Sequence, residues 1–418
     1  MIKFKKLMLL GLIGVFSGAL FIGCSNKQEN VDKKSNSEET KLSVFIPGYN
    51  DPGFKKAYDE NIEAFKKANP NIKIDLIGAG WEDFPKMINM IKSNNAPDIM
   101  LTGSRRLKQL INMKAIEPLD FYLKSDKKEQ YIESVLKTGN VENKQYGLPI
   151  GFSSRALYYR KDLIKNPPKN WDDLIKISKE VEKEHPNMKG FAIAGNNSDS
   201  TVDQLFNYFY QNEANAYDEN GKPVINSPKA VEALSFFTDL YKKYNVVKNP
   251  VDVNRGDFSN LFKNEQIAMF ISGPWEKNAM KLEPNNPKTP YGVALLPKGK
   301  VFGQTLVTDS ITISSSSNHK EDAFKFIDFM SSFERQNKFD EAVGFFPIFK
   351  EEQKDKRYQT DFLKPFVEMI KYGKPEPQPS VWEDFQNTVV KAIQKSLLGE
   401  STPKEALDEA QKQLEQSK

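Results

Sequence analysis

Strand-like and helix-like segments alternate along this sequence from residue 42 onward, and no other feature restricts the fold as strongly. The run KLSVFIPGY is β-branched and aromatic and ends at a Pro-Gly pair, and apolar residues from Phe54 to Phe65 then recur at helical spacing. A strand-like IKIDLI, a helix-like WEDFPKMINMIKS and a strand-like APDIML follow. This βαβαβ order predicts a mainly parallel sheet covered by helices.

The same pattern resumes in the second part of the chain. Asn170 and Ser227–Pro228 are typical helix starts, and Ala323 to Met330 has helical spacing. Thr402–Glu405 has the pattern of a capping box. Two α/β sections without a long polar joint predict two lobes that face each other, and a cleft between lobes is a usual place for a small ligand.

The first residues have the three parts of an export signal. Lys3, Lys5 and Lys6 precede an apolar run over 7–22, which is short for a membrane span. The run ends in FIGC, which resembles the lipobox of bacterial lipoproteins and implies that the Cys24 thiol is acylated. A plain signal anchor is the alternative. We expect a signal peptide over 1–23 and a flexible polar tether over 24–41.

Charge and cysteine content limit the partners. Removal of residues 1–23 takes away three lysines, so 57 basic residues face 56 acidic ones and the net charge is +1. A nearly neutral domain has no electrostatic reason to bind nucleic acid, and its membrane attachment would come from acyl chains alone. Cys24 is the only cysteine, so the core must hold the domain together without a disulfide.

Motifs for catalysis are scarce. The sequence has no H-E-x-x-H and no G-x-S-x-G, and His185 and His319 both stand at expected helix boundaries. Tyr158–Tyr159 lies in a strand-like run, which favours a structural role over a metal site. We therefore predict no catalytic residue, no metal and no cofactor. Acidic pairs for glycoside hydrolysis stay open, because the chain has too many carboxylates to single out a pair.

Each of the four tryptophans has an acidic neighbour. They are Trp81 beside Glu82, Trp171 beside Asp172, Trp275 beside Glu276, and Trp382 beside Glu383. Acidic residues favour the first turn of helices, and this explains Trp171, whose indole we expect to staple its helix. For the other three, an aromatic plate next to a carboxylate acceptor also suits a sugar ring, which has an apolar C–H face and a rim of hydroxyls.

The order of several motifs resembles a known family. The motifs are APDI (96–99), IEPLD (116–120), YGLPIGFSSRALYYRKDLI (146–164), PKNWDDL, NSPKAVEAL, FKNEQIAMFISGPW (262–275), YGVALLP, ITISSSSNHKEDAFKFIDFM and ALDEAQKQL. They are similar to the extracellular solute-binding proteins of ABC importers, in the sugar-binding branch that includes the maltose/maltodextrin-binding proteins. The resemblance covers about residues 42 to 416.

The resemblance implies a fold and its boundaries. The fold is the two-lobe α/β periplasmic-binding-protein fold of type II, in which each lobe has a mainly parallel sheet flanked by helices. Lobe I takes residues 42–149 and 308–342, and lobe II takes 150–307 and 343–418. Three crossing segments join the lobes, near Pro149–Ser153, Leu306–Ile311 and Ala342–Pro347.

The resemblance also implies a site between the lobes. Trp275 and Trp382 match aromatic residues that stack on sugar, and we expect both to be exposed in the empty cleft. LTGSRR places Arg105 where the maltose-binding relatives have an acid, and Ser153 replaces a carboxylate of the first crossing segment. These departures predict a ligand other than maltose. The complete set of predicted ligand-binding residues is Trp275, Trp382, Trp81, Glu82, Tyr49, Asn50, Arg105, Ser153 and Glu276.

The implied function is that of a lipid-anchored, monomeric receptor on the outer face of the cell membrane. It would capture a carbohydrate, which we expect to be an oligosaccharide, and present it to an ABC permease without catalysis. Two alternatives stay open. The same fold could bind a polyamine or another small polar solute, because Trp beside Glu or Asp also suits cations, and a surface glycosidase would be a different class of protein.

Overall fold

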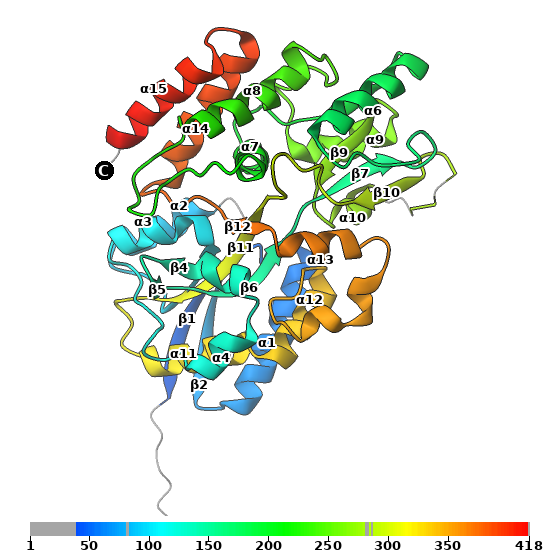
Figure 1. Cartoon of the computed structure of the whole chain (residues 1–418). Coiled ribbons are helices and arrows are strands. Elements are labelled where there is room, and N and C mark those ends of the chain that lie inside the picture. The colour runs from blue at the N-terminus through cyan, green and yellow to red at the C-terminus, as the bar shows by residue number, and fades with distance from the viewer. Residues whose placement is uncertain (1–38, 81–82, 281–283, 286, 417–418) are drawn as a thin grey trace, which may run out of the picture. The chain divides into compact units, whose positions relative to one another are not determined.

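The computed structural model describes residues 39–418 except 81–82, 281–283, 286 and 417–418 (Figure 1). The predicted signal peptide, Cys24 and the tether up to residue 38 lie outside the described residues. So do Trp81 and Glu82. The described residues from Glu39 onward form one compact unit with two main sheets.

The first sheet is built around three parallel strands of the N-terminal part: β1 (Thr40–Pro47), β2 (Ile72–Ala79) and β3 (Ile99–Gly103). The long strand β11 (Gln304–Ile313) runs antiparallel to β3, and it also pairs with β6 (Leu148–Ser153) and β12 (Gly373–Pro375). The short pair β4 (Asn140–Val141) and β5 (Lys144–Gln145) lies beside it as a separate ribbon.

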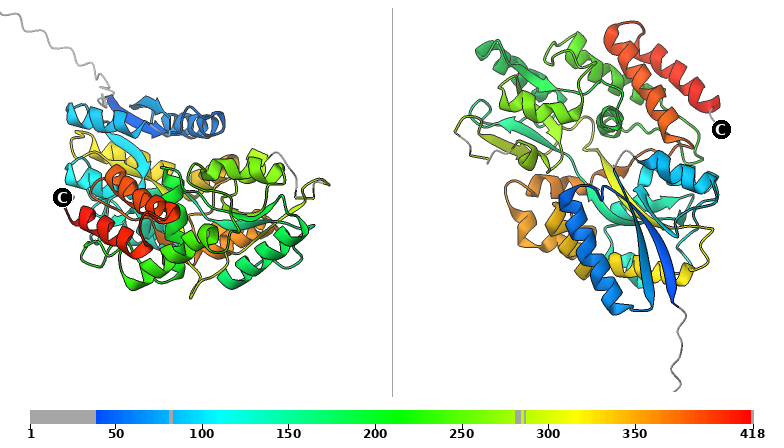
Figure 2. Two further views of the ribbon diagram at one scale, coloured as in Figure 1. Left: turned by 90° about the horizontal axis from the view of Figure 1, so that it is seen from above. Right: turned by 180° about the vertical axis from the view of Figure 1, so that it is seen from behind.

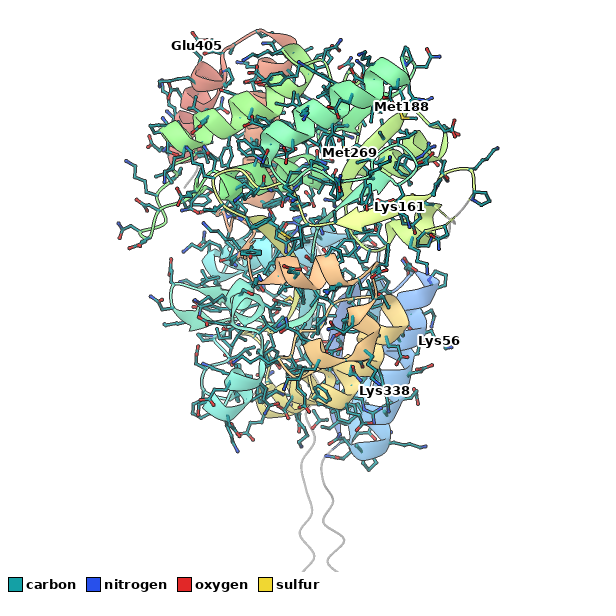
Figure 3. The ribbon with its side chains drawn as sticks, turned by 45° about the vertical axis from the view of Figure 1, so that its right-hand side comes forward. Lys56, Lys161, Met188, Met269, Lys338 and Glu405 are labelled. Atoms are coloured by element: carbon teal, nitrogen blue, oxygen red, sulfur yellow. The ribbon has the colours of Figure 1, made fainter. Side chains whose placement is uncertain are left out.

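Both faces of the first sheet are covered, which explains the continuous apolar run in β1. Val44 and Ile46 belong to one apolar core, and Phe45 between them belongs to another. Helices α1 (Pro52–Ala68), α11 (Lys320–Met330) and α12 (Phe333–Val343) pack together on the first of these cores. Their outer faces carry charge, as Lys56 on α1 and Lys338 on α12 show (Figure 3).

The helices near the other core are shorter. They are α2 (Phe84–Lys92) and α3 (Leu107–Asn112), whose buried residues join Phe45. Two further short helices, α4 (Ser125–Gln130) and α5 (Glu133–Leu136), precede β4. The strands and helices predicted for residues 42 to 103 are confirmed, except that α2 begins at Phe84 and the first two residues of its predicted run, Trp81 and Glu82, lie outside the described residues.

The second sheet has the order β10 (Tyr291–Ala294), β7 (Ala156–Arg160), β9 (Ile267–Ser272) and β8 (Lys189–Ala192). Only β8 and β9 are parallel, because β7 runs antiparallel to both of its neighbours. The prediction of a mainly parallel sheet is therefore wrong here, and both sheets are mixed. Both neighbours of β7 come roughly a hundred residues or more later in the chain, so no local βαβ unit sets its direction.

Helices surround the second sheet in the views of Figure 2. They are α6 (Trp171–Glu184), α7 (Asp199–Gln211), α8 (Pro228–Lys242), α9 (Phe258–Lys263), α10 (Glu276–Met280), α13 (Lys364–Ile370), α14 (Trp382–Leu398) and α15 (Pro403–Gln416). The middle of α7 is buried on every side. The predicted caps are confirmed at Asn170, Ser227 and Thr402, each of which accepts a bond from the first turn of its helix.

The expected staple at Trp171 is also confirmed. Its indole stacks on Phe236 with ring centroids 4.2 Å apart, and its N–H donates to Gln211 at 2.7 Å. His185 ends α6 and His319 precedes α11, as predicted for helix boundaries. Trp171 is thus part of the scaffold.

The three predicted crossing segments lie together. The first two form the antiparallel pair β6–β11. The third contacts the first through Phe345, whose ring lies against Gly151 of β6. A Cβ on Gly151 would lie 2.4 Å from this ring, so the glycine makes room for it. Gln336 of α12 adds a bond to the carbonyl of Ile150 at 2.7 Å. The residue boundaries of the two lobes stay a prediction.

Candidate ligand-binding site

Two arginines and one aspartate meet beside Trp275. Arg155 lies between β6 and β7, Asp203 lies on α7, and Arg255 opens the 3₁₀ turn Arg255–Asp257. Arg155 donates from Nε and Nη2 to Oδ2 of Asp203 at 3.0 and 2.8 Å, and Arg255 donates to the same oxygen. The guanidinium carbons lie 5.2 Å (Arg155) and 5.5 Å (Arg255) from the indole centroid.

The turn Gly273–Pro274–Trp275 explains how the indole reaches this place. A Cβ on Gly273 would lie 2.0 Å from the six-membered ring of Trp275, so the ring folds back over this glycine. The hydroxyl of Tyr158 donates to the carbonyl of Gly273 at 2.8 Å and fixes the turn to β7. Trp275 is 38% exposed, which agrees with the expected open indole and is unusual for a large aromatic side chain.

A second ion-pair group surrounds Arg105, which follows β3 in the 3₁₀ turn Ser104–Arg106. Its Nη2 lies 2.6 Å from Asp199 Oδ2 at the start of α7, and its Nη1 lies 3.4 Å from Glu376 Oε1 after β12. Its guanidinium carbon lies 5.1 Å from the centroid of Trp382, the first residue of α14. Arg105 therefore connects the first sheet to two helices that flank the second.

The expectation that Trp382 is exposed is wrong. Its exposure is 2%, because the indole N–H donates to Asp199 Oδ1 at 2.8 Å and Arg105 lies next to the ring. The indole also packs on Phe385 within the second apolar core. A role for Trp382 in ligand binding stays a prediction, and it would require Arg105 to move off the ring.

Glu376 links the two groups, because the charges of Arg105 in one group and of Arg155 and Asp203 in the other all shift the pKa of its carboxyl. We call the six residues Arg105, Arg155, Asp199, Asp203, Arg255 and Glu376 the arginine cluster. Burial raises the pKa of Glu376 to about 7, an effect that Arg105 offsets only in part. Burial likewise raises the pKa of the neighbouring Asp309 to about 6.

Asp203 behaves in the opposite way. Burial disfavours its charge, yet Arg155 and Arg255 outweigh that cost and hold the pKa of its carboxyl below the usual range. Asp203 is therefore a permanent anion between two cations. This difference in ionisation between Asp203 and Glu376 follows from the number of arginines in contact with each.

Three buried polar atoms of the arginine cluster have no hydrogen-bond partner among the described residues. They are Nε of Arg105, Oδ1 of Asp203 and Oε2 of Glu376. One is a donor and two are acceptors. Buried polar atoms normally find partners, so we expect water or a bound polar molecule to supply them here.

The remaining predicted residues are distributed as follows. Ser153 joins the cluster, because its Oγ accepts from Nη1 of Arg155 at 2.7 Å. Glu276 is 2% exposed and accepts from Ser272 at 2.6 Å, and it also bonds the Trp275 side chain and lies within reach of the Arg255 charge, so it is a buried group beside the cluster and not an acceptor on the cleft surface. Tyr49 bonds Asp59 and Lys55 on α1, and its neighbour Asn50 is exposed.

Sequence reasoning missed Arg155, Asp199, Asp203, Arg255 and Glu376. For Arg155 a signal was present, because a cation in the apolar run GFSSRALYY must be paired if the run is buried. The others stand in ordinary polar stretches, and their partners lie as far away as the 271 residues between Arg105 and Glu376. A single sequence gives no indication of such pairs.

A large hollow lies next to the cluster. Its volume is about 1300 Å³, and it is lined by Glu376, Gln378, Tyr210 and the segments 140–143 and 215–223. Of the predicted ligand-binding residues that the structure describes, which excludes Trp81 and Glu82, none lines it. Across the described part of the chain, no group of three or more acidic, His or Cys side chains could hold a metal, and no helix is long and apolar enough to cross a membrane.

Two mixed sheets joined by paired crossing strands, with a polar cluster and an open indole between elements of both, define a ligand-binding protein of the two-lobe type. Comparison with known proteins agrees. The family model described as bacterial extracellular solute-binding protein matches residues 51–336, so the chain belongs to this family. The family is non-catalytic, as predicted.

Individual relatives support the same assignment. A Brucella abortus protein, named only as a binding protein, is 30% identical over 362 residues, which cover 84% of this chain and 87% of its own. The maltooligosaccharide ABC transporter solute-binding lipoprotein of Streptococcus pneumoniae R6 is 24% identical over 413 residues, covering 93% and 92%. The structure of the sugar-binding protein MalE of Xanthomonas citri has a TM-score of 0.79 at 20% identity, covers 90% of this chain and 97% of its own, and confirms the fold.

Proposed function

We propose that this protein is a lipid-anchored receptor that captures an oligosaccharide between its two lobes and delivers it to an ABC permease. The observation that carries the proposal is the open indole of Trp275 beside the arginine cluster. An aromatic plate binds the C–H face of a sugar ring, and charged donors and acceptors bind its hydroxyls. The names of the pneumococcal lipoprotein and of the Xanthomonas protein support a carbohydrate ligand.

The alternative of a polyamine or another cation is less consistent with these contacts. Two guanidinium groups already lie within 5.5 Å of the Trp275 centroid. A ligand cation at the same ring would be repelled by both, because like charges at short distance disfavour each other.

The test is a tryptophan-fluorescence titration of the mature protein with mono- to pentasaccharides. A saturable change for at least one oligosaccharide, absent in Trp275→Ala, is the expected result. A matched control is Trp171→Phe, which removes a scaffold indole and should leave the affinity unchanged. Saturable binding of spermidine together with no response to any sugar would refute the proposal.

A further inference from the structure

One arginine of the cluster, Arg255, shares its ion-pair partner with another arginine among the described residues, and it lies beside the open indole. Arg105 is paired with Asp199 and Glu376, and Arg155 is paired with Asp203. The adjacent Arg106 is paired with Glu383 of α14. Arg255 shares the Asp203 oxygen that Arg155 already uses, and the buried carboxyl of Glu276 is a further acid that its charge reaches.

The hydrogen-bond donors of these two arginines are used to different extents. All three nitrogens of Arg155 are engaged, two on Asp203 and one on Ser153, and this side chain is 1% exposed. Arg255 uses Nη1 alone and is 17% exposed. Within the described residues its Nε and Nη2 have no partner, so one edge of a planar guanidinium remains available.

An available guanidinium edge suits one ligand group in particular. Its two parallel N–H donors match the two oxygens of a carboxylate, and the charge-assisted pair that results is strong. A ligand that covered this edge without offering an acceptor would instead take water from two donors that have no other partner among the described residues, which is costly. The exposed part of the Trp275 indole, whose centroid lies 5.5 Å from this guanidinium, offers a surface for the ring that bears the carboxylate.

We propose that the ligand is an acidic oligosaccharide, with a uronate ring that stacks on Trp275 and pairs its carboxylate with Arg255. Asp203 is a positioning residue that holds both arginines against the indole. This inference rests on the proposed function and narrows it from carbohydrates in general to sugars that carry a carboxylate.

Matched pairs of acidic and neutral sugars separate the uronate assignment from sugar capture in general. We would titrate the mature protein by calorimetry with trigalacturonate and galactotriose, and with cellotriose and its fully C6-oxidised glucuronate counterpart. The expected result is tighter binding of an acidic trisaccharide than of its neutral partner. That affinity should fall with added salt, because an ion pair at a partly exposed site is screened.

Variants of Arg255 give the second readout. Arg255→Gln should weaken binding of the acidic sugar by about thirtyfold or more, the loss typical of a truncated interfacial charge pair. The control is Arg335→Gln on α12, an arginine that likewise lies 5.1 Å from an aromatic ring, Phe329, but outside the cluster. It should bind like the wild type. If Arg255→Gln lowers the melting temperature, Arg255→Lys serves as the second variant, because it keeps the charge. Arg255→Lys should retain the preference for the acidic sugar at reduced affinity.

Two outcomes would overturn the inference in distinguishable ways. A neutral trisaccharide that binds at least as tightly as its acidic partner would refute the uronate assignment while leaving sugar capture intact. Failure of every sugar, acidic or neutral, would refute the proposed function and the inference together.

Discussion

Trp275 and Trp382 differ in exposure, 38% against 2%, so their truncation should have different consequences. Trp275→Ala should weaken ligand binding by about thirtyfold, or about 2 kcal/mol, while the melting temperature without ligand barely moves. Trp382→Ala should leave a cavity and lower the free energy of unfolding by about 3–5 kcal/mol. Calorimetry and urea denaturation on each variant separate affinity from stability. A Trp275→Ala protein that unfolds readily yet binds normally would show that Trp275 belongs to the core.

Glu376 should make the stability of the protein depend on pH. Its pKa is about 7 in the folded state against an ordinary value of 4.5, so folding favours the protonated carboxyl. The stabilisation is complete below about pH 4.5 and is lost as the pH rises through about 7. At about 1.4 kcal/mol per pKa unit, the loss is up to about 3 kcal/mol.

Urea denaturation of the wild type and of Glu376→Gln at pH 5 and pH 8 measures this contribution. The amide cannot ionise, so the variant should lose less stability between the two pH values than the wild type does. Asp309 contributes to both proteins and cancels in the comparison. Equal losses in the two proteins would contradict the assignment of this pH dependence to Glu376.

At the scale of single elements, the contact between Gly151 of β6 and Phe345 should limit what the crossing segments tolerate. A methyl group on Gly151 would lie 2.4 Å from two ring carbons, so Gly151→Ala should destabilise the fold by about 1–3 kcal/mol through overpacking. Gly53→Ala is the matched control. Its Cβ would approach nothing closer than 3.8 Å, and alanine is favoured in helix α1.

A double-mutant cycle with Phe345→Ala tests whether this contact is the cause. Removal of the ring should reduce the cost of Gly151→Ala, since the clashing atoms are then absent. Urea denaturation of the four proteins gives the coupling energy. Additive effects would locate the strain at another contact of β6.

The elements that could be predicted from sequence are those whose signals are local. The cap residues Asn170, Ser227 and Thr402 fix their helices through contacts of three residues or fewer. The strand direction of β7 could not be predicted, because it depends on a strand more than a hundred residues later, as the pair Leu157–Ile271 shows. The arginine cluster was missed for the same reason, and the burial of Trp382 depends on Arg105 and Asp199, which are distant in sequence.

At the scale of the whole molecule, the predicted lobes should close on the ligand by rotation about the crossing segments. Hinge closure of this kind is known for periplasmic binding proteins, which are among the standard examples of the motion. Small-angle scattering should give a smaller radius of gyration with saturating ligand than without it. A radius that does not change at saturation would argue against closure.

The predicted lipid anchor can be tested independently of the ligand, although Cys24 lies outside the described residues. Cys24→Ser should release a folded protein from the membrane, because the tether was predicted to add nothing to the core. Fractionation after a high-salt wash, with circular dichroism of the released protein, measures both expectations. A variant that stays in the membrane fraction would be inconsistent with lipidation at this residue.

The position of β11 in the first sheet has a consequence for the order in which a growing chain can fold. β1, β2 and β3 are synthesised first, but β11, the strand that pairs antiparallel with β3, begins only at Gln304. The side chain of Gln304 in turn bonds Ser154, 150 residues earlier in the chain. Such non-local pairing slows folding, because a long loop must close before its contacts form. A nascent chain shorter than about 300 residues therefore lacks the strand that pairs with both β3 and β6. We therefore expect the predicted export signal to act on a chain that has not yet committed to its native state.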